Sequence, residues 1–206
     1  MTEIYLVRHP ESTLNTHPSF ISGRSNQIPV TERGAEQARR FAHVFSTQYP
    51  HPTSYYSSPA VRTKTLLDIY NQTTAQHNDY SIDFNLQEIS QGQSEGKIRS
   101  EVYTPEVLEL IAQQQFDFAL PGGESLNDTS NRILTWTHEM EAKHPNGVIL
   151  ASTHGQAIRA TVGKLLGWNY FECTLDVAHQ IDNVSLTRLT VENGEITVDF
   201  LGKKYH

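Results

Sequence analysis

A run of apolar residues without alternation is the feature of this sequence that most restricts its fold. Residues 147–152 read Gly-Val-Ile-Leu-Ala-Ser, with no polar side chain at every second position. Such a run is typical of a central strand in a parallel sheet whose two faces are both covered. It is also far too short to cross a bilayer, so we expect no membrane-spanning segment and no membrane partner.

Two strand-then-helix patterns precede this run. Strands are expected at residues 4–7 and 54–57. Thr31 has the position of an N-cap residue, and apolar residues recur after it at helical spacing. Ser58 and Pro59 suit the N-cap and the first helical position of a second helix. Alternating strands and helices of this kind predict a layered α/β fold.

The middle and the end of the chain have different patterns. The segment 81–121 is irregular, apart from a short strand and a helix expected at residues 105–115, and we interpret it as a small cap. Ser125 begins a capping-box pattern for the helix that follows. Near the C-terminus, residues 185–191 and 196–200 alternate on either side of an Asn-Gly pair, which predicts a β-hairpin.

Length and composition fit these elements into one unit. The 206 residues suit one sizeable domain, and 37% apolar with 19% charged residues is ordinary for a globular protein. We therefore predict a single domain over residues 1–206 with a cap at about 81–121. Its fold class is α/β: a three-layer α/β/α sandwich with a mainly parallel central sheet, the small cap insert and a C-terminal β-hairpin.

Charge and cysteine content restrict the partners and the location. The formal net charge is −7, and a negative chain repels phosphate backbones at long range, so nucleic-acid binding is disfavoured. Cys173 is the single cysteine, which excludes an internal disulfide and fits a reducing compartment. The N-terminus lacks the basic region and long apolar core of a signal peptide. We expect a cytoplasmic protein whose oligomeric state stays open, with a homodimer as one option.

Two histidines follow predicted strands in the same way. Arg8-His9 comes after the first strand, and His154-Gly155 comes after the apolar run. Because ligands of a parallel α/β sheet bind beyond the carboxyl ends of its strands, both histidines should lie at one edge. Arg62, in the first turn of the second helix, should reach the same edge. There the arginines could bind one phosphate, and the helix N-termini would add partial positive charge.

Six short motifs strengthen this interpretation, because they occur in a fixed order and cover nearly the whole chain. They are Leu6-Val7-Arg8-His9, Thr31-x-x-Gly34-x-x-Gln37-Ala38, Ser57-Ser58-Pro59-x-x-Arg62-Thr63, Leu86-x-Glu88-Ile89-x-x-Gly92-x-x-Glu95-Gly96, Pro121-Gly122-Gly123-Glu124-Ser125 and Ser152-Thr153-His154-Gly155. Together they resemble the motifs of the histidine phosphatase superfamily, also called the phosphoglycerate-mutase-like family. Any one of them alone would be weak evidence.

The resemblance implies roles at the predicted edge. His9 matches the nucleophile that takes up the phosphoryl group, and Arg8, Arg62 and His154, with Gly155 beside it, match the rest of the phosphate pocket. These roles agree with phosphoryl-transfer chemistry, in which charge spreads over the equatorial oxygens of a loose transition state. Two arginines and a protonated His154 could stabilise that charge. We therefore expect neither a metal ion nor a cofactor, and the sequence has no recognisable metal-ligand spacing.

Two assignments have named alternatives. Glu88 matches the usual proton donor to the leaving group, but Glu11, Glu95 and Glu124 also stand in the matching motifs. Asn15 matches a polar residue that often lines the phosphate pocket. Its alternative role is to stabilise the loop after the first strand.

One departure from the superfamily's pattern lies beside the nucleophile. The superfamily usually has glycine there, whereas this chain has Pro10. Proline removes a backbone donor, fixes φ and pushes His9 toward an extended conformation. An amide donor at this position, where the superfamily uses one, is therefore missing from this chain.

A second departure concerns specificity. No Lys or Arg occurs between Arg99 and Arg132, and Ile89, Ser90 and Gln91 follow Glu88. Phosphoglycerate mutases, which this chain resembles, place cations just after the acid and in the cap to hold a second anionic group of the substrate. Tyr103, Phe116 and Phe118 could offer the remote part of a substrate an apolar wall, or could form the core of the cap. This pattern favours a substrate whose remote part is not strongly anionic.

The function that the sequence supports best is therefore hydrolysis of a phosphomonoester, a small phosphorylated metabolite, through a phosphohistidine intermediate. Two alternatives remain open. A phosphomutase of the phosphoglycerate type would retain the intermediate and return the phosphoryl group. A weakly active phospholigand-binding regulatory protein is the other, and Pro10 is the sequence feature that favours it.

Overall fold

The computed structural model describes residues 1–204 and contains a six-stranded sheet in the order β3-β2-β4-β1-β5-β6. The four strands from β3 to β1 run parallel, and β5 and β6 add an antiparallel hairpin. The predicted mainly parallel sheet and the C-terminal hairpin are confirmed. The strands span Thr2–Arg8 (β1), Ser54–Ser57 (β2), Ser81–Ile82 (β3), Val148–Thr153 (β4), Leu186–Glu192 (β5) and Glu195–Lys203 (β6).

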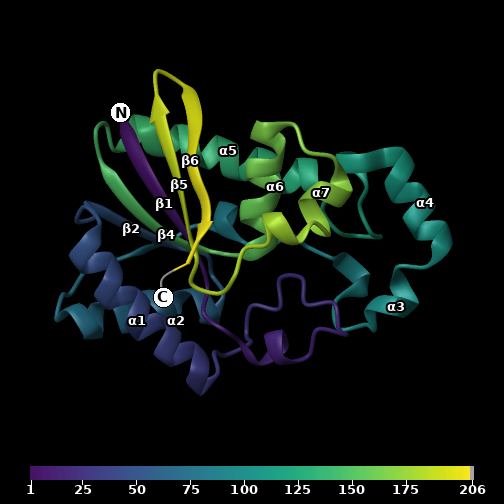
Figure 1. The fold of residues 1–206 in the computed structure, drawn as a ribbon, viewed down its shortest axis with the longest axis horizontal. Coiled ribbons are helices and arrows are strands. Elements are labelled where there is room, and N and C mark those ends of the chain that lie inside the picture. The colour runs from purple at the N-terminus through teal and green to yellow at the C-terminus, as the bar shows by residue number, and fades with distance from the viewer. Residues whose placement is uncertain (205–206) are drawn as a thin grey trace.

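Helices cover both faces of the sheet, so the three-layer prediction is also confirmed. In Figure 1, α1 and α2 lie on one side of the strands, α5 and α6 lie on the other, and α3 and α4 lie at the far end of the molecule. The α-helices span Glu32–Gln48 (α1), Val61–Thr74 (α2), Arg99–Val102 (α3), Pro105–Gln114 (α4), Leu126–Lys143 (α5), Gly155–Leu166 (α6) and Tyr170–Thr174 (α7). Within residues 1–204, no helix is long and apolar enough to span a membrane.

The side chains of β1 show why the central strands lack polar alternation. Ile4 and Leu6 pack in the core layer that includes Trp136 of α5, whereas Tyr5 and Val7 pack in the layer beneath α1 and α2. All four strand side chains are at most 1% exposed. Burial of each such side chain stabilises the fold by roughly 1.5–3 kcal/mol, so both faces of the strand must be apolar.

The register between β1 and β4 sets the position of the candidate site. Arg8 pairs with Thr153 at the last step of the parallel ladder. The backbone N–H of His9 then donates to the carbonyl of Thr153 over 2.9 Å. His9 and His154 each follow directly after their strand, so they leave the sheet side by side at its carboxyl edge.

The helix starts agree with the sequence patterns at two positions and differ at one. Thr31 and Ser125 cap α1 and α5 through their side chains, as predicted. The prediction for the second helix was wrong, because α2 begins at Val61 with Ala60 as its N-cap. Ser58 lies two residues before this N-cap, and its hydroxyl pairs with Nε2 of His154 at 2.7 Å and accepts from the backbone N–H of Ala60 over 3.3 Å.

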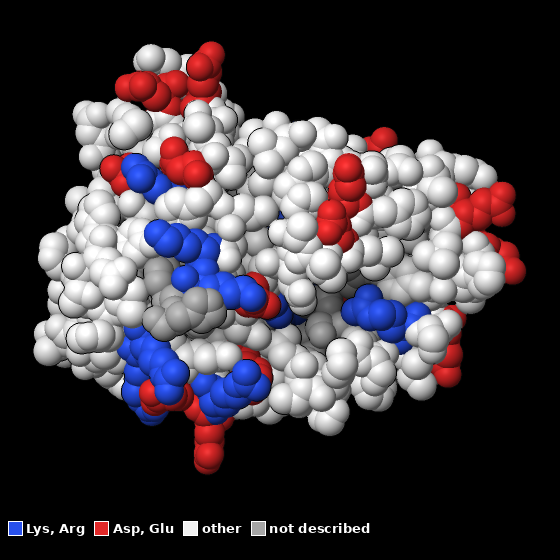
Figure 2. Space-filling view, viewed as in Figure 1, with Lys and Arg blue, Asp and Glu red and all other residues white. Residues whose placement is uncertain are grey.

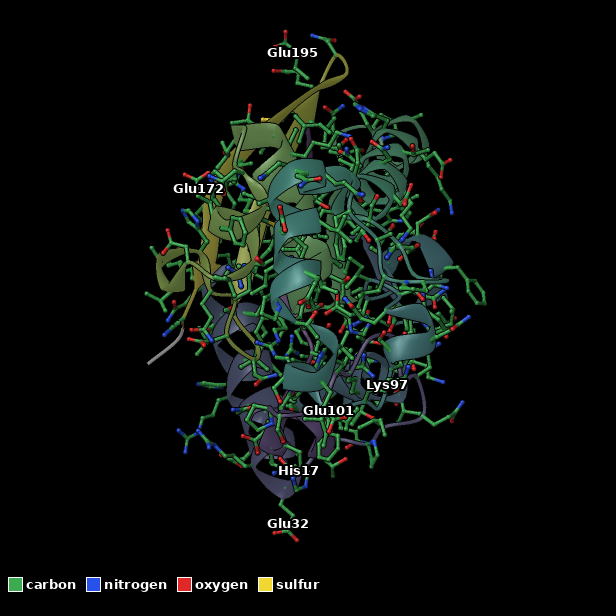
Figure 3. The ribbon with its side chains drawn as sticks, turned by 90° about the vertical axis from the view of Figure 1, so that its right-hand side faces the viewer. His17, Glu32, Lys97, Glu101, Glu172 and Glu195 are labelled. Carbon is green, nitrogen blue, oxygen red and sulfur yellow. The ribbon has the colours of Figure 1, made fainter. Side chains whose placement is uncertain are left out.

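The middle segment packs against the loop that follows β1. Backbone bonds join Ile21 to Lys97 and Arg99 to Ser19, so α3 lies beside this loop. In Figure 3, labelled Lys97, Glu101 and His17 accordingly lie at the same end of the molecule. The helix predicted at residues 105–115 is α4. The division of the chain into a domain and a cap stays a prediction, whereas the contact with the β1 loop is a feature that the sequence did not suggest.

Candidate active site

A cavity of about 590 Å³ opens at the carboxyl edge of the sheet. Its walls come from the loop after β1, from the middle segment with α3 and α4, and from the segment between α7 and β5. Figure 2 shows this face hollowed, with Lys and Arg atoms at the rim and mostly uncharged residues around it. Arg8, His9, Asn15, Arg62 and Glu88 all line the cavity, so five of the predicted site residues share one space.

His9 has a defined tautomer. Its Nδ1 lies 2.7 Å from the carbonyl oxygen of Pro10, and a carbonyl only accepts, so Nδ1 carries the proton. Nε2 is then the atom with the free lone pair. Burial lowers the pKa of His9 well below its usual value, and the charges of Arg62 and Arg8 lower it further. His9 is therefore a neutral imidazole, the form that can act as a nucleophile.

His154 is fully buried beside His9, with 5.2 Å between the ring centroids. Nη2 of Arg62 lies 3.1 Å from its Nδ1, and a guanidinium only donates, so this nitrogen accepts. The proton then sits on Nε2, which faces Ser58. Burial and the charge of Arg62 lower the pKa of His154 well below its usual value. The expected protonated His154 is therefore wrong for the free protein, and this ring does not line the cavity.

Arg62 is 4% exposed and is held by three acceptors. Besides His154, it donates from Nη1 to the carbonyl of Ser25 over 2.8 Å and from Nη2 to the carbonyl of Arg24 over 3.1 Å. Burial lowers the pKa of Arg62 to about 10, which leaves it charged at neutral pH. The loop after β1 thus folds onto this arginine and fixes its position in the cavity wall.

Arg8 is held by the segment between α7 and β5. Its Nη1 donates to the carbonyl of Ile181, and its Nε is buried without a partner among the described residues. Gly155 makes room for this side chain, since a Cβ at position 155 would lie only 3.2 Å from that Nε. Gly155 therefore acts on the cavity through Arg8 and does not line the cavity itself.

Glu88 occupies the N-terminus of α6. Its Oε1 accepts from the backbone N–H of Ala157 over 2.9 Å and of Ile89 over 3.0 Å, and its Oε2 accepts from that of Gln156 over 3.2 Å. The partial positive charge of a helix N-terminus attracts such a group. We expected this helix end to face the phosphate, and the structure shows instead that it orients the carboxyl group of Glu88.

The three alternative carboxylates serve structural contacts. Glu11 pairs with Arg33 at 3.4 Å and Glu124 with Arg132 at 3.1 Å, while Glu95 accepts from backbone N–H groups of the β1 loop. None of the three lines the cavity. Glu88 is therefore the carboxylate among the four candidates that a bound substrate could reach.

Comparison with known proteins agrees with this geometry. The family model of the histidine phosphatase superfamily (branch 1) matches residues 4–204. The chain belongs to this superfamily.

Relatives within the superfamily carry the names of two activities. Phosphoserine phosphatase 1 of Hydrogenobacter thermophilus is 30% identical over 173 residues, covering 81% of this chain and 77% of the relative. The 2,3-bisphosphoglycerate-dependent phosphoglycerate mutase 2 of Gloeobacter violaceus is 28% identical over 171 residues, covering 80% and 76%. The solved structure of YhfR from Bacillus stearothermophilus has the same fold, with a TM-score of 0.83, 22% identity and coverage of 100% and 98%.

Pro10 departs from the superfamily's pattern without removing the contact that orients the ring of His9. The group that binds Nδ1 of His9 is the carbonyl of Pro10, which proline retains. Proline lacks only the backbone N–H, and that group takes no part in this contact. The departure therefore leaves the tautomer of His9 intact.

Asn15 and Asn183 contact the loop that follows β1 and also contact each other. Oδ1 of Asn15 accepts from the backbone N–H of Ser12 over 3.0 Å, which is the loop-stabilising alternative, yet the residue also lines the cavity. Nδ2 of Asn183 donates to the carbonyl of His9 over 2.9 Å and lies 3.3 Å from Oδ1 of Asn15. Sequence reasoning missed Asn183, and no motif surrounds it that could have revealed it.

The outer wall of the cavity corrects part of the sequence interpretation. Tyr103 lines it, whereas Phe116 and Phe118 do not. Phe118 packs in an apolar cluster of the middle segment, and Phe116 packs against a cluster that joins this segment to α5, α6 and α7. Arg99 also lines it, with its guanidinium carbon 5.7 Å from the ring centre of Tyr103. Beyond Arg8 and Arg62, it is the one Lys or Arg among the described cavity residues.

Proposed function

We propose that this protein hydrolyses phosphomonoesters of small metabolites through a phosphohistidine at His9. The observation that supports this most directly is the bond between Nδ1 of His9 and the carbonyl of Pro10, which leaves Nε2 free to attack. Burial keeps the ring neutral. Arg8 and Arg62 provide the positive charge that a phosphoryl group needs beside this nitrogen.

The reaction proceeds in two steps. Nε2 of His9 forms a bond to phosphorus while the ester P–O bond breaks, and Arg8 and Arg62 stabilise the charge on the equatorial oxygens. Glu88 gives its proton to the leaving alkoxide. Water then attacks the phosphorus and returns a proton to Glu88, the P–N bond breaks, and inorganic phosphate leaves a neutral His9.

The other predicted residues support this chemistry by position. His154 accepts from Arg62 and thereby holds the guanidinium in place. Gly155 leaves the space that Arg8 occupies, and Asn15 presents its amide at the cavity wall. The step sequence uses no metal ion. Within residues 1–204, no group of three His, Cys, Asp or Glu side chains has the arrangement of a metal site.

Hydrolysis is favoured over a mutase reaction by the charge of the cavity. A mutase must retain its substrate between two transfers, which calls for a second anion site. Arg99 is the one further cation among the described lining residues, and it lies exposed at the rim. Arg132, the next cation in the sequence, is bound to Glu124. A second anion site would therefore depend on Arg99 alone.

We further propose a cytoplasmic location and a cap formed by residues 81–121. The free and buried thiol of Cys173 fits a reducing compartment. The middle segment supplies Glu88, Arg99 and Tyr103 to the cavity, which is the contribution expected of a cap.

The test is a panel of phosphomonoesters assayed in EDTA, with the His9→Ala variant as the control. We expect turnover by the wild type, an acid-labile phosphoprotein after rapid quenching, and loss of both in His9→Ala. A 3-phosphoglycerate assay with and without a bisphosphate primer separates hydrolysis from mutase activity. Undiminished turnover by His9→Ala, or strict dependence on a divalent metal, would overturn the proposal.

A further inference from the structure

Three large, exposed apolar side chains line the same cavity although they come from distant parts of the chain. Phe20 belongs to the loop after β1, Leu108 to α4, and Leu175 follows α7. They are 39%, 42% and 69% exposed. Exposed apolar side chains that gather in one concave place, rather than singly, mark a surface that binds something.

These side chains continue an apolar wall that begins inside the cavity. Leu14 and Pro18 of the β1 loop lie on one side, and Ile111, Tyr103 and Phe171 lie on the other. The volume of about 590 Å³ is far larger than a phosphate group requires. The space beyond the phosphate end is therefore bounded in part by these apolar side chains and in part by polar ones such as Gln91, Gln156 and Gln180.

The charged groups of the cavity leave little for a second anion. Asp182 lines the cavity as well and adds negative charge, which its ion pair with Lys204 offsets in part. Arg99 is exposed and lies over Tyr103, where water competes for any ligand. A carboxylate on the remote part of a substrate would meet one hydrated cation, whereas an alkyl or aryl group could pack against the apolar side chains of both walls.

We propose, on the basis of the proposed function, that the preferred substrates are phosphomonoesters whose leaving group is an apolar alkyl or aryl body. The phosphate lies between Arg8, Arg62 and His9, and the apolar body extends along the wall to Phe20, Leu108 and Leu175. The chemistry of the reaction stays as described, since only the part of the substrate away from phosphorus is specified.

A series of primary n-alkyl phosphates from ethyl to hexyl tests this, because chain length changes burial without changing the leaving oxygen. Each methylene that the wall fully buries should raise kcat/KM by about fourfold, so burial of two of the four added methylenes would already make hexyl phosphate better than ethyl phosphate by more than about tenfold. 3-Phosphoglycerate serves as the substrate with an anionic remote part, and phosphoserine as one whose remote part is zwitterionic. The inference is overturned if kcat/KM does not rise with chain length, or if kcat/KM for phosphoserine exceeds that for hexyl phosphate tenfold. The second result would mean that Arg99 binds the remote part of the substrate.

α4 offers a matched pair of variants. Leu108 and Leu110 are 42% and 43% exposed, but Leu108 lines the cavity and Leu110 does not. Leu108→Ala should lower the hexyl-to-ethyl ratio of kcat/KM severalfold, and Leu110→Ala should leave it unchanged. Equal ratios in both variants would contradict the inference. Failure of the proposed function itself would look different. In that case the wild type would hydrolyse no ester of the series faster than the His9→Ala variant does.

Discussion

Nη2 of Arg62 donates a hydrogen bond to Nδ1 of His154 over 3.1 Å, which makes His154 a neutral acceptor. The neighbouring His9 is also neutral, because its Nδ1–H is bound to a carbonyl and its surroundings are buried and positive. Two neutral imidazoles therefore lie side by side among arginines. His9 has an unprotonated Nε2, the atom that we propose attacks phosphorus, and His154 accepts the hydrogen bond that holds Arg62 in place.

This arrangement predicts that acid destabilises the fold through both histidines. Their folded-state pKa values lie well below the usual value, whereas in the unfolded chain they return to about 6.5. Below pH 6.5 the unfolded state binds more protons, so stability falls as the pH falls. Each histidine should cost about 1.4 kcal/mol between pH 7.5 and 5.5, measured by urea unfolding without phosphate.

His9→Asn isolates the contribution of one ring, since the asparagine amide can still donate to the carbonyl of Pro10. The loss of stability between pH 7.5 and 5.5 should shrink by about 1.4 kcal/mol in this variant. His43→Asn, on the exposed side of α1, should leave the wild-type difference unchanged. The same pH dependence in His9→Asn as in the wild type would show that His9 titrates normally in the folded protein.

The edge of the sheet at which the two histidines meet was predictable, because an apolar strand and a parallel crossover place it there. Their protonation was not predictable. It depends on which group donates to which nitrogen, and those donors, such as Arg62, come from other parts of the chain. The same reason explains why Ser58 was assigned to a helix cap, although its hydroxyl faces His154.

The choice of the candidate proton donor also depended on contacts that the sequence does not reveal. Four glutamates stood in matching motifs, and sequence spacing could not separate them. Only contacts distinguish Glu88, held by the N-terminus of α6, from Glu124, held by arginines. Asn183 had no local pattern at all, because its bond to the carbonyl of His9 joins opposite ends of the chain.

Pro10→Gly should retain most of the activity. The contact that fixes the tautomer of His9 is a backbone carbonyl, and glycine keeps it. We expect kcat within about threefold of the wild type and a loss of stability of about 0.5–1 kcal/mol, because glycine is more flexible in the unfolded chain. Steady-state kinetics and urea unfolding measure the two effects. A hundredfold drop in kcat would mean that the proline ring itself orients the nucleophile.

Glu124→Gln should affect the fold and leave the pH dependence of catalysis alone. The carboxylate joins Arg24 at 2.8 Å and Arg132 at 3.1 Å, and the variant leaves both arginines without their counter-charge. We expect a loss of about 2 kcal/mol in the free energy of unfolding. Glu36→Gln, whose ion pairs on α1 are exposed, should show no measurable change. A shifted pH profile of kcat in Glu124→Gln would instead implicate Glu124 in proton transfer.

Gly155→Ala should impair activity without weakening the fold. The added Cβ would lie 3.2 Å from Nε of Arg8, so the guanidinium must move by a few tenths of an ångström. Alanine favours a helix by about 1 kcal/mol relative to glycine, and position 155 is the first residue of α6, so the melting temperature should not fall.

We expect kcat/KM of Gly155→Ala to fall roughly three- to tenfold, because phosphate binding and transition-state charge both depend on where Arg8 lies. The affinity for inorganic phosphate, measured by calorimetry, should fall in parallel. Arg8→Lys serves as the comparison, since it removes the guanidinium that the glycine accommodates. Adding Gly155→Ala to Arg8→Lys should then cause little further loss, because the contact between the two residues no longer exists. A full additional loss in the double variant would show that Gly155 acts on the site by a route other than Arg8.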